Sequence, residues 1–546
     1  MPDERTLTLY RNGSVYSAAD PFASAILVDG DTVAWIGSEQ AATSIVDSRM
    51  DVVDLDGALV APGFIDSHVH VTDTGLRLTS LDLAPAHSAA ELLDAVAREA
   101  SALPAGAVLR GFGWDEAGWN DPTLPGAEEL ARAAGGRPAF LNRVDVHSAL
   151  VSPALAEAAG IVGAPGLDGA LARGEALYAA REAARPSAQE IRHLHARALK
   201  HAASRGYVGL VEQAAPGLAG PDDLRLLLGP DNASGPEVIA YWGQAVSSAE
   251  EAREVLADLG VPVRGLAGDL NIDGSIGSRT ALLSEPYTDA QDTRGRAFLT
   301  AEQIGAHLAA VSAIGVQGGF HVIGDAGLRL ALEGLRIASE AVGLSAVRAA
   351  GHRLEHVEMA SEADAEALAG YGVTVSAQPL FDAVWGGPGG LYERRLGARH
   401  AGMNPFLRFH SAGVPLAFGS DSPVCAPSPW ESIRACLTHS DPDQRISARA
   451  AFIGHTRAGW RAVKHRNPLM GQLAPGAPAS FAVWRVDELM VQVADERVQA
   501  WSTDPRARTP LLPALDTERL PECLQTVHEG RELFRSESFD AGLARR

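Results

Sequence analysis

The middle of the chain alternates short apolar runs with helix-forming segments, and this alternation limits what the chain can fold into. Strands that alternate with helices predict a parallel sheet whose outer side is covered by the helices. Eight such strands predict a (β/α)8 barrel, with its active site at the carboxyl ends of the strands. The predicted strands cover residues 64–70, 207–212, 237–242, 263–273, 316–321, 353–356, 373–377 and 414–418.

Both ends of the chain contain short strands without intervening helices. We expect these ends to build one small β-sandwich together, so that residues 1–60 and 471–546 flank a barrel formed by residues 61–470. The predicted sandwich strands lie at residues 7–10, 25–28, 33–37, 479–484, 491–493 and 525–528.

Residues from about 72 to 186 interrupt the alternation after the first barrel strand, and we interpret them as an insertion. An insertion on the catalytic face of a barrel can act as a lid and select the substrate. The alternative is a structural subdomain whose tryptophans belong to its core.

Charge and composition exclude several classes of partner. Lys and Arg total 46 and Asp and Glu total 68, which gives a net charge of −22 and argues against nucleic acid or an anionic membrane. No apolar run reaches the roughly 18 residues of a membrane helix, and the N-terminus lacks the layout of a signal peptide. Three widely spaced cysteines predict no disulfide framework and fit the cytoplasm. The oligomeric state stays open, with a homodimer as one option.

Histidines and one aspartate stand at the ends of the predicted strands. His68 and His70 are one residue apart, so side-chain alternation places both imidazoles on one face of the first strand. His321, His356 and Asp421 follow three later strands. A histidine taken singly is more often a hydrogen-bonded core or surface residue. Four imidazoles and a carboxylate together suit Zn²⁺ or a similar divalent ion, with room for a bound water.

Hydrolysis is the chemistry that such a set of ligands favours. A divalent ion lowers the pKa of its bound water from about 15.7 toward 7. Asp421 can accept the proton of that water and deliver it to a leaving nitrogen. His356 or His321 can help to polarise the scissile carbonyl. We therefore assign Asp421 first and His356 second as catalytic residues.

Several motifs of the chain resemble those of the amidohydrolase superfamily. The sequence PGFIDSHVH at 62–70 is similar to the first-strand signature. Three later motifs resemble the fifth-, sixth- and eighth-strand signatures of this superfamily: FHVIGD at 320–325, LEH at 354–356 and FGSD at 418–421. Three further motifs resemble those of the YtcJ-like branch of amidohydrolase family 3, which includes N-substituted formamide deformylases. They are DGSIGSRTA at 273–281, GWD at 113–115 and DVHSA at 145–149.

This resemblance covers nearly the whole chain. It implies a metal-dependent hydrolase with a distorted (β/α)8 TIM barrel and a β-sandwich built from both chain ends. It also implies that metal is bound by His68, His70, His321, His356 and Asp421, and that the aspartate is catalytic.

One position departs from the family pattern. Relatives often carry a lysine four residues before the Asp-Gly-Ser motif, where it can be carbamylated and bridge two metals, whereas this chain has Asp269. An aspartate can bind a metal directly, bridge two ions, or lie beside a single ion. Glu212, at the end of the second strand, is another candidate ligand. We therefore expect one or two ions, of zinc or another divalent metal.

Three further residues are candidates for substrate binding. Arg279 follows the fourth strand and can clamp a carboxylate or carbonyl of the substrate, or else form a structural ion pair with one of the nearby acids. Trp114 and His147 can line the pocket from the insertion. The histidines of the helix before the second strand, His195 among them, are predicted to lie at the surface.

The sequence thus predicts an enzyme that hydrolyses a non-peptide carbon–nitrogen bond of a small molecule, such as an N-substituted formamide. The alternatives are a hydrolase of cyclic imides, ureas or carbamates with the same site, and a barrel protein that binds metal without hydrolysis.

Overall fold

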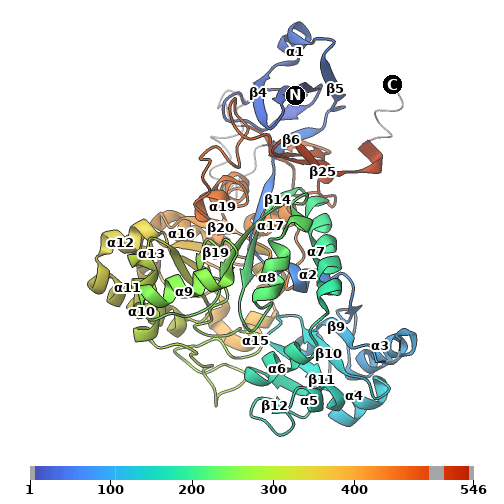
Figure 1. Cartoon of the computed structure of the whole chain (residues 1–546), viewed down its shortest axis with the longest axis vertical. Coiled ribbons are helices and arrows are strands. Elements are labelled where there is room, and N and C mark those ends of the chain that lie inside the picture. The colour runs from blue at the N-terminus through green and yellow to red at the C-terminus, as the bar shows by residue number, and fades with distance from the viewer. Residues whose placement is uncertain (1–6, 105, 491–509, 540–546) are drawn as a thin grey trace.

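Parallel strands arranged in two sheets form the centre of the molecule (Figure 1). The structure is a computed structural model that describes residues 7–104, 106–490 and 510–539. Within these residues, a three-stranded sheet has the order β15-β14-β7, and a five-stranded sheet has the order β16-β17-β18-β19-β20. The strands are β7 (Phe64–Val69), β14 (Tyr207–Ala214), β15 (Glu237–Trp242), β16 (Gly265–Leu266), β17 (Gln317–Val322), β18 (Arg353–His356), β19 (Thr374–Ala377) and β20 (Leu416–Phe418).

All neighbouring strands of these two sheets are parallel, as the alternation predicts. Backbone hydrogen bonds connect one sheet to the other at both edges. The Ala267 N–H donates to the carbonyl of Trp242 over 3.1 Å, and the Asp421 N–H donates to the carbonyl of His68 over 2.8 Å. The described residues do not form one closed sheet, but the carboxyl ends of the strands face a common space.

Helices follow or precede most of these strands and cover their outer side (Figure 1). In α11, Leu328, Ala331, Leu335 and Ala338 are buried at helical spacing, so one face of this helix packs on the sheet. No helix of the described ranges is both long and apolar enough to cross a membrane. The principal helices are α7 (Ala188–Ala203), α9 (Ala249–Leu259), α10 (Ala301–Ala313), α11 (Asp325–Val342), α13 (Glu362–Tyr371), α16 (Phe406–Ala412) and α17 (Pro429–Leu437).

The fourth strand is shorter than the sequence predicts. The sequence predicts an extended segment at residues 263–273, but the strand β16 covers only Gly265–Leu266. Gly268 has a φ of +87°, a backbone conformation that side chains disfavour. A Cβ at this position would lie 2.5 Å from Oε1 of Gln213. The chain therefore turns at Gly268, and the turn exposes Asp269 to the space at the strand ends.

Helix α7 corrects the prediction for His195. The sequence places this histidine at the surface, but the side chain is fully buried. Its Nε2 atom lies 2.9 Å from Oδ1 of Asp223 and 2.8 Å from the hydroxyl of Thr72. Helix α7 is covered by α2 (Val71–Arg77) and α8 (Pro221–Leu227) on this side, and a pattern read from one helix does not reveal which neighbours cover it.

Both chain ends contribute strands to one sheet at the top of the molecule in Figure 1. This five-stranded sheet has the order β2-β6-β21-β24-β25, and its strands are β2 (Ser14–Val15), β6 (Leu59–Pro62), β21 (Phe481–Arg485), β24 (Glu522–His528) and β25 (Arg531–Arg535). A four-stranded sheet, β4-β3-β1-β5, shares a hydrophobic cluster with it; its strands are β1 (Leu7–Arg11), β3 (Ala25–Asp29), β4 (Thr32–Gly37) and β5 (Met50–Asp54). The strand predicted at residues 491–493 lies outside the described residues.

The segment between β7 and β14 builds a sheet of its own, at the lower right of Figure 1. Its six strands have the order β12-β13-β11-β10-β9-β8. They are β8 (Leu81–Asp82), β9 (Leu109–Trp114), β10 (Ala139–Arg143), β11 (Ser148–Val151), β12 (Leu167–Asp168) and β13 (Leu171–Arg173). The helices α3 (Ala89–Ala102), α4 (Ala127–Ala133), α5 (Pro153–Ala158) and α6 (Glu175–Ala183) accompany this sheet.

Phe64 joins the upper sheets to the central strands, and we expect Phe64→Ala to destabilise the protein strongly. The ring is fully buried, 5.2 Å from the ring of Trp430 and 5.7 Å from that of Trp484 in β21. Removing a buried ring costs about 3–5 kcal/mol of unfolding free energy, which urea denaturation would measure. Phe22, which is 63% exposed, offers a matched control: Phe22→Ala should change stability by less than about 0.5 kcal/mol. Equal effects of the two substitutions would contradict this role of Phe64.

Candidate metal centre

Strand β7 carries two of the predicted ligands at its carboxyl end. His68 and His70 are both buried, and their ring centroids lie 5.3 Å apart. His70 is also the N-cap residue of α2. Because one residue separates them on an extended chain, the two imidazoles point to the same side of the strand.

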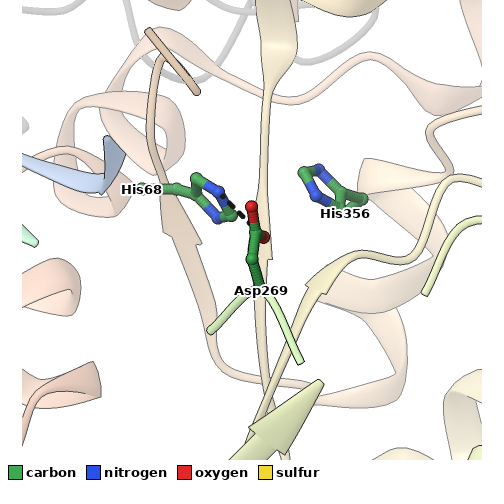
Figure 2. Close-up of side chains that lie close together, drawn as sticks. All are labelled: His68, Asp269 and His356. Carbon is green, nitrogen blue, oxygen red and sulfur yellow. Dashed lines mark ion pairs between the residues drawn. The ribbon is translucent and has the colours of Figure 1, made fainter. Parts of the chain in front are cut away.

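Two carboxylates face these imidazoles. Oδ1 of Asp421 lies 3.4 Å from Nε2 of His68 and 3.4 Å from Nε2 of His70. Oδ2 of Asp269 lies 3.1 Å from Nε2 of His70, and its Oδ1 lies 3.6 Å from Nε2 of His68. Figure 2 shows the Asp269 carboxylate between the rings of His68 and His356. The structure therefore brings residues of the first, fourth and eighth strands to one point.

Strands β17 and β18 supply the other two imidazoles. The ring centroids of His321 and His356 lie 4.5 Å apart, and that of His356 lies 5.0 Å from that of His68. Nδ1 of His321 lies 3.9 Å from Oδ1 of Asp269. His68, His70, His321, His356 and Asp421 thus form one cluster with Asp269.

Three ring nitrogens that do not face this cluster have protein partners. Nδ1 of His68 lies 2.9 Å from Oε2 of Glu355, and Nδ1 of His356 lies 2.8 Å from Oε1 of Gln378. Nε2 of His321 lies 3.2 Å from the carbonyl oxygen of Gly274. Such partners fix the ring orientation and the tautomer of metal-binding histidines.

Glu355 remains charged although it is completely buried. Burial disfavours the carboxylate, but the neighbouring Arg353 guanidinium and His68 hold the pKa of Glu355 at about 2. Nη2 of Arg353 donates to Oε2 of Glu355 over 2.9 Å. The charged carboxylate can accept the Nδ1 proton of His68, which leaves the Nε2 lone pair of that ring directed at the cluster.

The pKa values of the residues in the cluster are shifted in different directions. Burial disfavours the charge of His70, but Asp269 and Asp421 raise its pKa well above the usual value. His70, His68 and His321 in turn hold the pKa of Asp269 well below its usual value despite burial. Burial and the adjacent ring of His356 lower the pKa of His321. The arrangement therefore favours a charged Asp269 beside a protonated His70 and a neutral His321, and a bound divalent ion would replace the proton of His70.

Two atoms of the cluster point to a bound cation. Nε2 of His68 and Oδ1 of Asp269 are buried and form no hydrogen bond with any residue that the structure describes. Buried polar atoms are nearly always paired, and a cation between these two atoms would pair both. Ligand atoms lie within 4.8 Å of one another in two overlapping groups: His68, His70 and Asp421, and His68, Asp269 and His356. The nitrogen and oxygen donors fit zinc or another first-row divalent ion.

The Asp-Gly-Ser motif positions the loop beside His321. The Asp273 carboxylate accepts the N–H groups of Leu282, Ile323 and Gly324 at 2.8–2.9 Å. These bonds join the loop after β16 to the turn that follows β17. Burial raises the pKa of Asp273 to about 7. We conclude that this aspartate is a positioning residue for the loop and not a metal ligand.

Two cavities open onto the cluster. The smaller comprises about 360 Å³ of empty space, part of it open to solvent, and its wall includes His321, His356 and Asp421 together with Phe381 and Trp385. The larger cleft borders the other side of the cluster and lies between the insertion and the central strands. It is lined by His70 and Asp269, and by Arg279 and His147 among others.

The predicted substrate residues have different surroundings. His147 lines both cavities. Arg279 lines the larger cleft, but its guanidinium pairs with Asp289 over 2.8 Å and 3.1 Å, which is the structural alternative that the sequence allows. Trp114 is buried in the core of the insertion, where its Nε1–H donates to the carbonyl of Leu141. In the described part of the chain, Trp114 is absent from the walls of both cavities, because its strand directs the indole into the insertion.

Glu212 lies at the N-terminal end of α2. Its Oε2 accepts the N–H of Val71 over 2.7 Å, and burial raises the pKa of Glu212 to about 8. It stands outside both ligand groups that the described residues form.

The smaller cavity is also lined by residues that are not among the candidates predicted from the sequence. Oε2 of Glu358 and Nε1 of Trp385 are buried there and have no hydrogen-bond partner among the described residues. Glu358 stands two residues after His356 at a predicted strand end, and this position is the feature of the sequence that could have indicated a role in the site. His356 and Val357 have φ values of 69° and 49°, so strand alternation does not predict where Glu358 points.

We expect Asp269→Ala to lower the metal content of the purified protein, because it removes a carboxylate that faces three imidazoles. The loss of metal affinity should be about tenfold or more, measured as the metal-to-protein ratio after dialysis against defined metal concentrations. Asp289→Ala removes a carboxylate that pairs with Arg279 and Arg395 instead and should leave the ratio unchanged. Equal ratios in the two variants would exclude Asp269 as a ligand.

Comparisons with known proteins agree with this geometry. A family model described as an amidohydrolase family matches residues 51–534. The chain is similar to Protein LONG AFTER FAR-RED 3 of Arabidopsis thaliana, with 26% identity over 518 residues, 87% of this chain and 86% of that protein. It is also similar to YtcJ of Bacillus subtilis, with 25% identity over 533 residues, 89% of this chain and 96% of that protein.

A third relative is the N-substituted formamide deformylase of Arthrobacter pascens, with 22% identity over 484 residues, 82% of this chain and 87% of the relative. An uncharacterized metal-dependent hydrolase from Pyrococcus furiosus has a similar solved structure, with a TM-score of 0.68 at 25% identity, over 87% of this chain and 98% of that one. The expected branch and a TIM-barrel-like α/β fold are thereby confirmed. Since the family match contains every residue of the cluster, the chain belongs to the amidohydrolase family and is a metal-dependent hydrolase that acts on carbon–nitrogen bonds other than peptide bonds.

Proposed function

We propose that the protein hydrolyses a small amide, such as an N-substituted formamide, with Asp421 as the residue that carries the proton. One observation supports this role above all. The Asp421 carboxylate lies 3.4 Å from two imidazoles of the cluster and also lines the smaller cavity. It can therefore reach both an ion held by the cluster and a substrate in the cavity.

The cluster has enough donors for two divalent ions, for which zinc is our choice. His68, His70 and Asp421 would hold one ion, and His321 and His356 would hold the second. Asp269 would contact both, because its carboxylate faces His68 and His70 of the first group and also His321 of the second. A bound divalent ion supplies Lewis acidity that lowers the pKa of a water molecule and polarises a carbonyl.

Two side chains of the protein would transfer the proton and orient the scissile bond. Asp421 takes a proton from the attacking water as the carbon–oxygen bond forms. It then gives this proton to the amide nitrogen as the carbon–nitrogen bond breaks, so that the products are a carboxylic acid and an amine. His356 lines the cavity next to Asp421 and would help to orient the scissile carbonyl.

The smaller cavity favours a compact substrate with an apolar substituent. Phe381, Trp385 and Leu391 supply apolar wall, while His147 reaches the cavity from the insertion. The formamide class is supported by the relative that is named an N-substituted formamide deformylase. Arg279 would bind a polar group of the substrate at the larger cleft if its pair with Asp289 opens.

The proposal extends to the architecture. We interpret residues 61–470 as a distorted (β/α)8 barrel with an insertion at about 72–186, and residues 1–60 and 471–546 as one β-sandwich. Three observations support this division: the parallel order of the central strands, the separate sheet of the insertion, and the sheet that contains strands from both chain ends.

Asp421→Asn should lower kcat by about 10²–10⁴-fold, because it removes proton transfer and leaves the side-chain shape. The bound metal, measured in the same preparation, should persist in part. Asp325→Asn is a matched control, since Asp325 also follows a central strand but accepts hydrogen bonds from Ser284. Full activity of Asp421→Asn would exclude the proposed proton carrier, and metal binding without turnover in the unaltered protein would favour the non-hydrolytic alternative.

A substrate panel tests the bond that is cleaved. The metal-loaded enzyme is assayed with N-substituted formamides, N-acyl amides, cyclic imides, ureas and carbamates, and amine release or ring opening is followed. We expect the highest kcat/KM for formamides, because their small acyl group fits the smaller cavity. Activity restricted to imides, ureas or carbamates would replace formamide by the alternative class.

A further inference from the structure

A separate cavity lies between the insertion and helix α2, away from the ligand cluster. It comprises about 620 Å³ of empty space, part of which is open to solvent. Arginines from four places in the chain line it: Arg77 of α2, Arg110 of β9, Arg181 of α6, and Arg185 after α6. In a protein with a net charge of −22, this concentration of guanidinium groups requires an explanation. We call this cavity the arginine pocket.

Arg181 has hydrogen-bonding capacity that the protein does not use. Its Nη1 pairs with Oδ2 of Asp73, and only 10% of the side chain is exposed. Its Nε and Nη2 atoms are buried and have no hydrogen-bond partner among the residues that the structure describes. Leaving a buried, charged donor unpaired is costly, and two adjacent guanidinium donors match the two oxygens of a carboxylate.

The other arginines are held mainly by carbonyl groups, which fix them without removing their charge. Arg110 donates to the carbonyl of Ala184, and Arg185 donates to that of Ala219. Arg77 donates to the carbonyl of Pro423. The positive charges of the pocket are therefore positioned and only partly neutralised.

The acidic neighbours of the pocket are largely engaged or exposed. Asp223 accepts hydrogen bonds from Thr72 and lies against His195. Glu182, which pairs with Arg185, is 65% exposed, and Glu190, 3.9 Å from Arg110, is 56% exposed, so solvent screens both pairs. The charge of Asp73, which is partly buried in the wall of the pocket, would repel an anion bound there.

We propose that the arginine pocket binds the carboxylate of a small organic anion that has an apolar body. Arg181 receives the carboxylate, and Phe112 and Phe140 of the same wall contact the apolar part. The pocket is distinct from the metal cluster, because none of the six ligand residues belongs to its described lining.

The position of the pocket connects it to the catalytic site. Thr72, Asp73 and Arg77 belong to α2, which begins directly after His70. Asp73 and Arg181 also line the larger cleft that reaches Asp269. The anion can therefore be a separate effector bound behind α2 or the acidic end of a substrate that extends from the cleft, and both present the same carboxylate to Arg181.

Calorimetric titration with phenylacetate, compared with uncharged 2-phenylethanol, tests the pocket in the metal-loaded protein. We expect binding of phenylacetate only, and a loss of affinity of about tenfold or more in Arg181→Met. Asp73→Asn should bind phenylacetate more tightly, since it removes the opposing charge. Arg253→Met, which alters an exposed arginine of α9, should bind as the unaltered protein does.

Unchanged affinity in Arg181→Met would place phenylacetate elsewhere, for example at the metal cluster, and would overturn the proposal. If Arg181→Met fails to fold, as judged by its melting temperature, Arg110→Met provides the same comparison. Kinetics then distinguish the two sources of the carboxylate. An effector alters turnover of a neutral amide without competing with it, whereas a substrate end makes phenylacetate a competitor and makes Arg181→Met raise KM for acid-bearing amides alone.

Discussion

The hydrogen-bonded contact between the first and the last central strand determines the geometry of the whole site. The Asp421 N–H donates to the carbonyl of His68 over 2.8 Å. The buried Asp66 carboxylate accepts the N–H of Ser420 over 2.8 Å and its hydroxyl over 2.6 Å. Residues that are about 350 positions apart are thereby placed in fixed register. His68, His70 and Asp421 can converge on one ion because these backbone and carboxylate bonds hold the two strand ends together.

The converging side chains form a cluster that is unfavourable without a cation. Burial penalises charge on the four imidazoles and on Asp269. The pKa values of His70 and Asp269 move in opposite directions because each stabilises the charge of the other. A divalent ion would replace protons on the imidazoles and would satisfy the unpaired atoms of His68 and Asp269. The buried Arg353–Glu355 pair keeps the orientation of His68 independent of that ion. The site is therefore organised by the protein before an ion or substrate enters.

The sequence predicts the parts of this site that depend on strand periodicity. His68 and His70 share a face because the strand is regular, and a residue such as Asp421 is found because it ends an apolar run. Asp269 reaches the cluster through a turn at Gly268, which periodicity does not describe; the family pattern, not the strand pattern, identified this position. Trp114 could not be placed from sequence, because an indole near a turn is equally compatible with a core and with a pocket.

One ionic network connects the insertion to the loop that lies beside the metal cluster. Arg143, at the end of an insertion strand, lies 3.1 Å from Oδ2 of Asp145, and the same carboxylate oxygen accepts the hydroxyls of Ser275 and Ser278 from the loop after β16. The bonds of Asp273 fix the other end of that loop beside His321. A change in the insertion therefore reaches the cavity wall through this loop, while the strand contact that organises the ligands stays intact. The residues that would bind the metal and the residues that line the cavity wall can therefore change independently of one another.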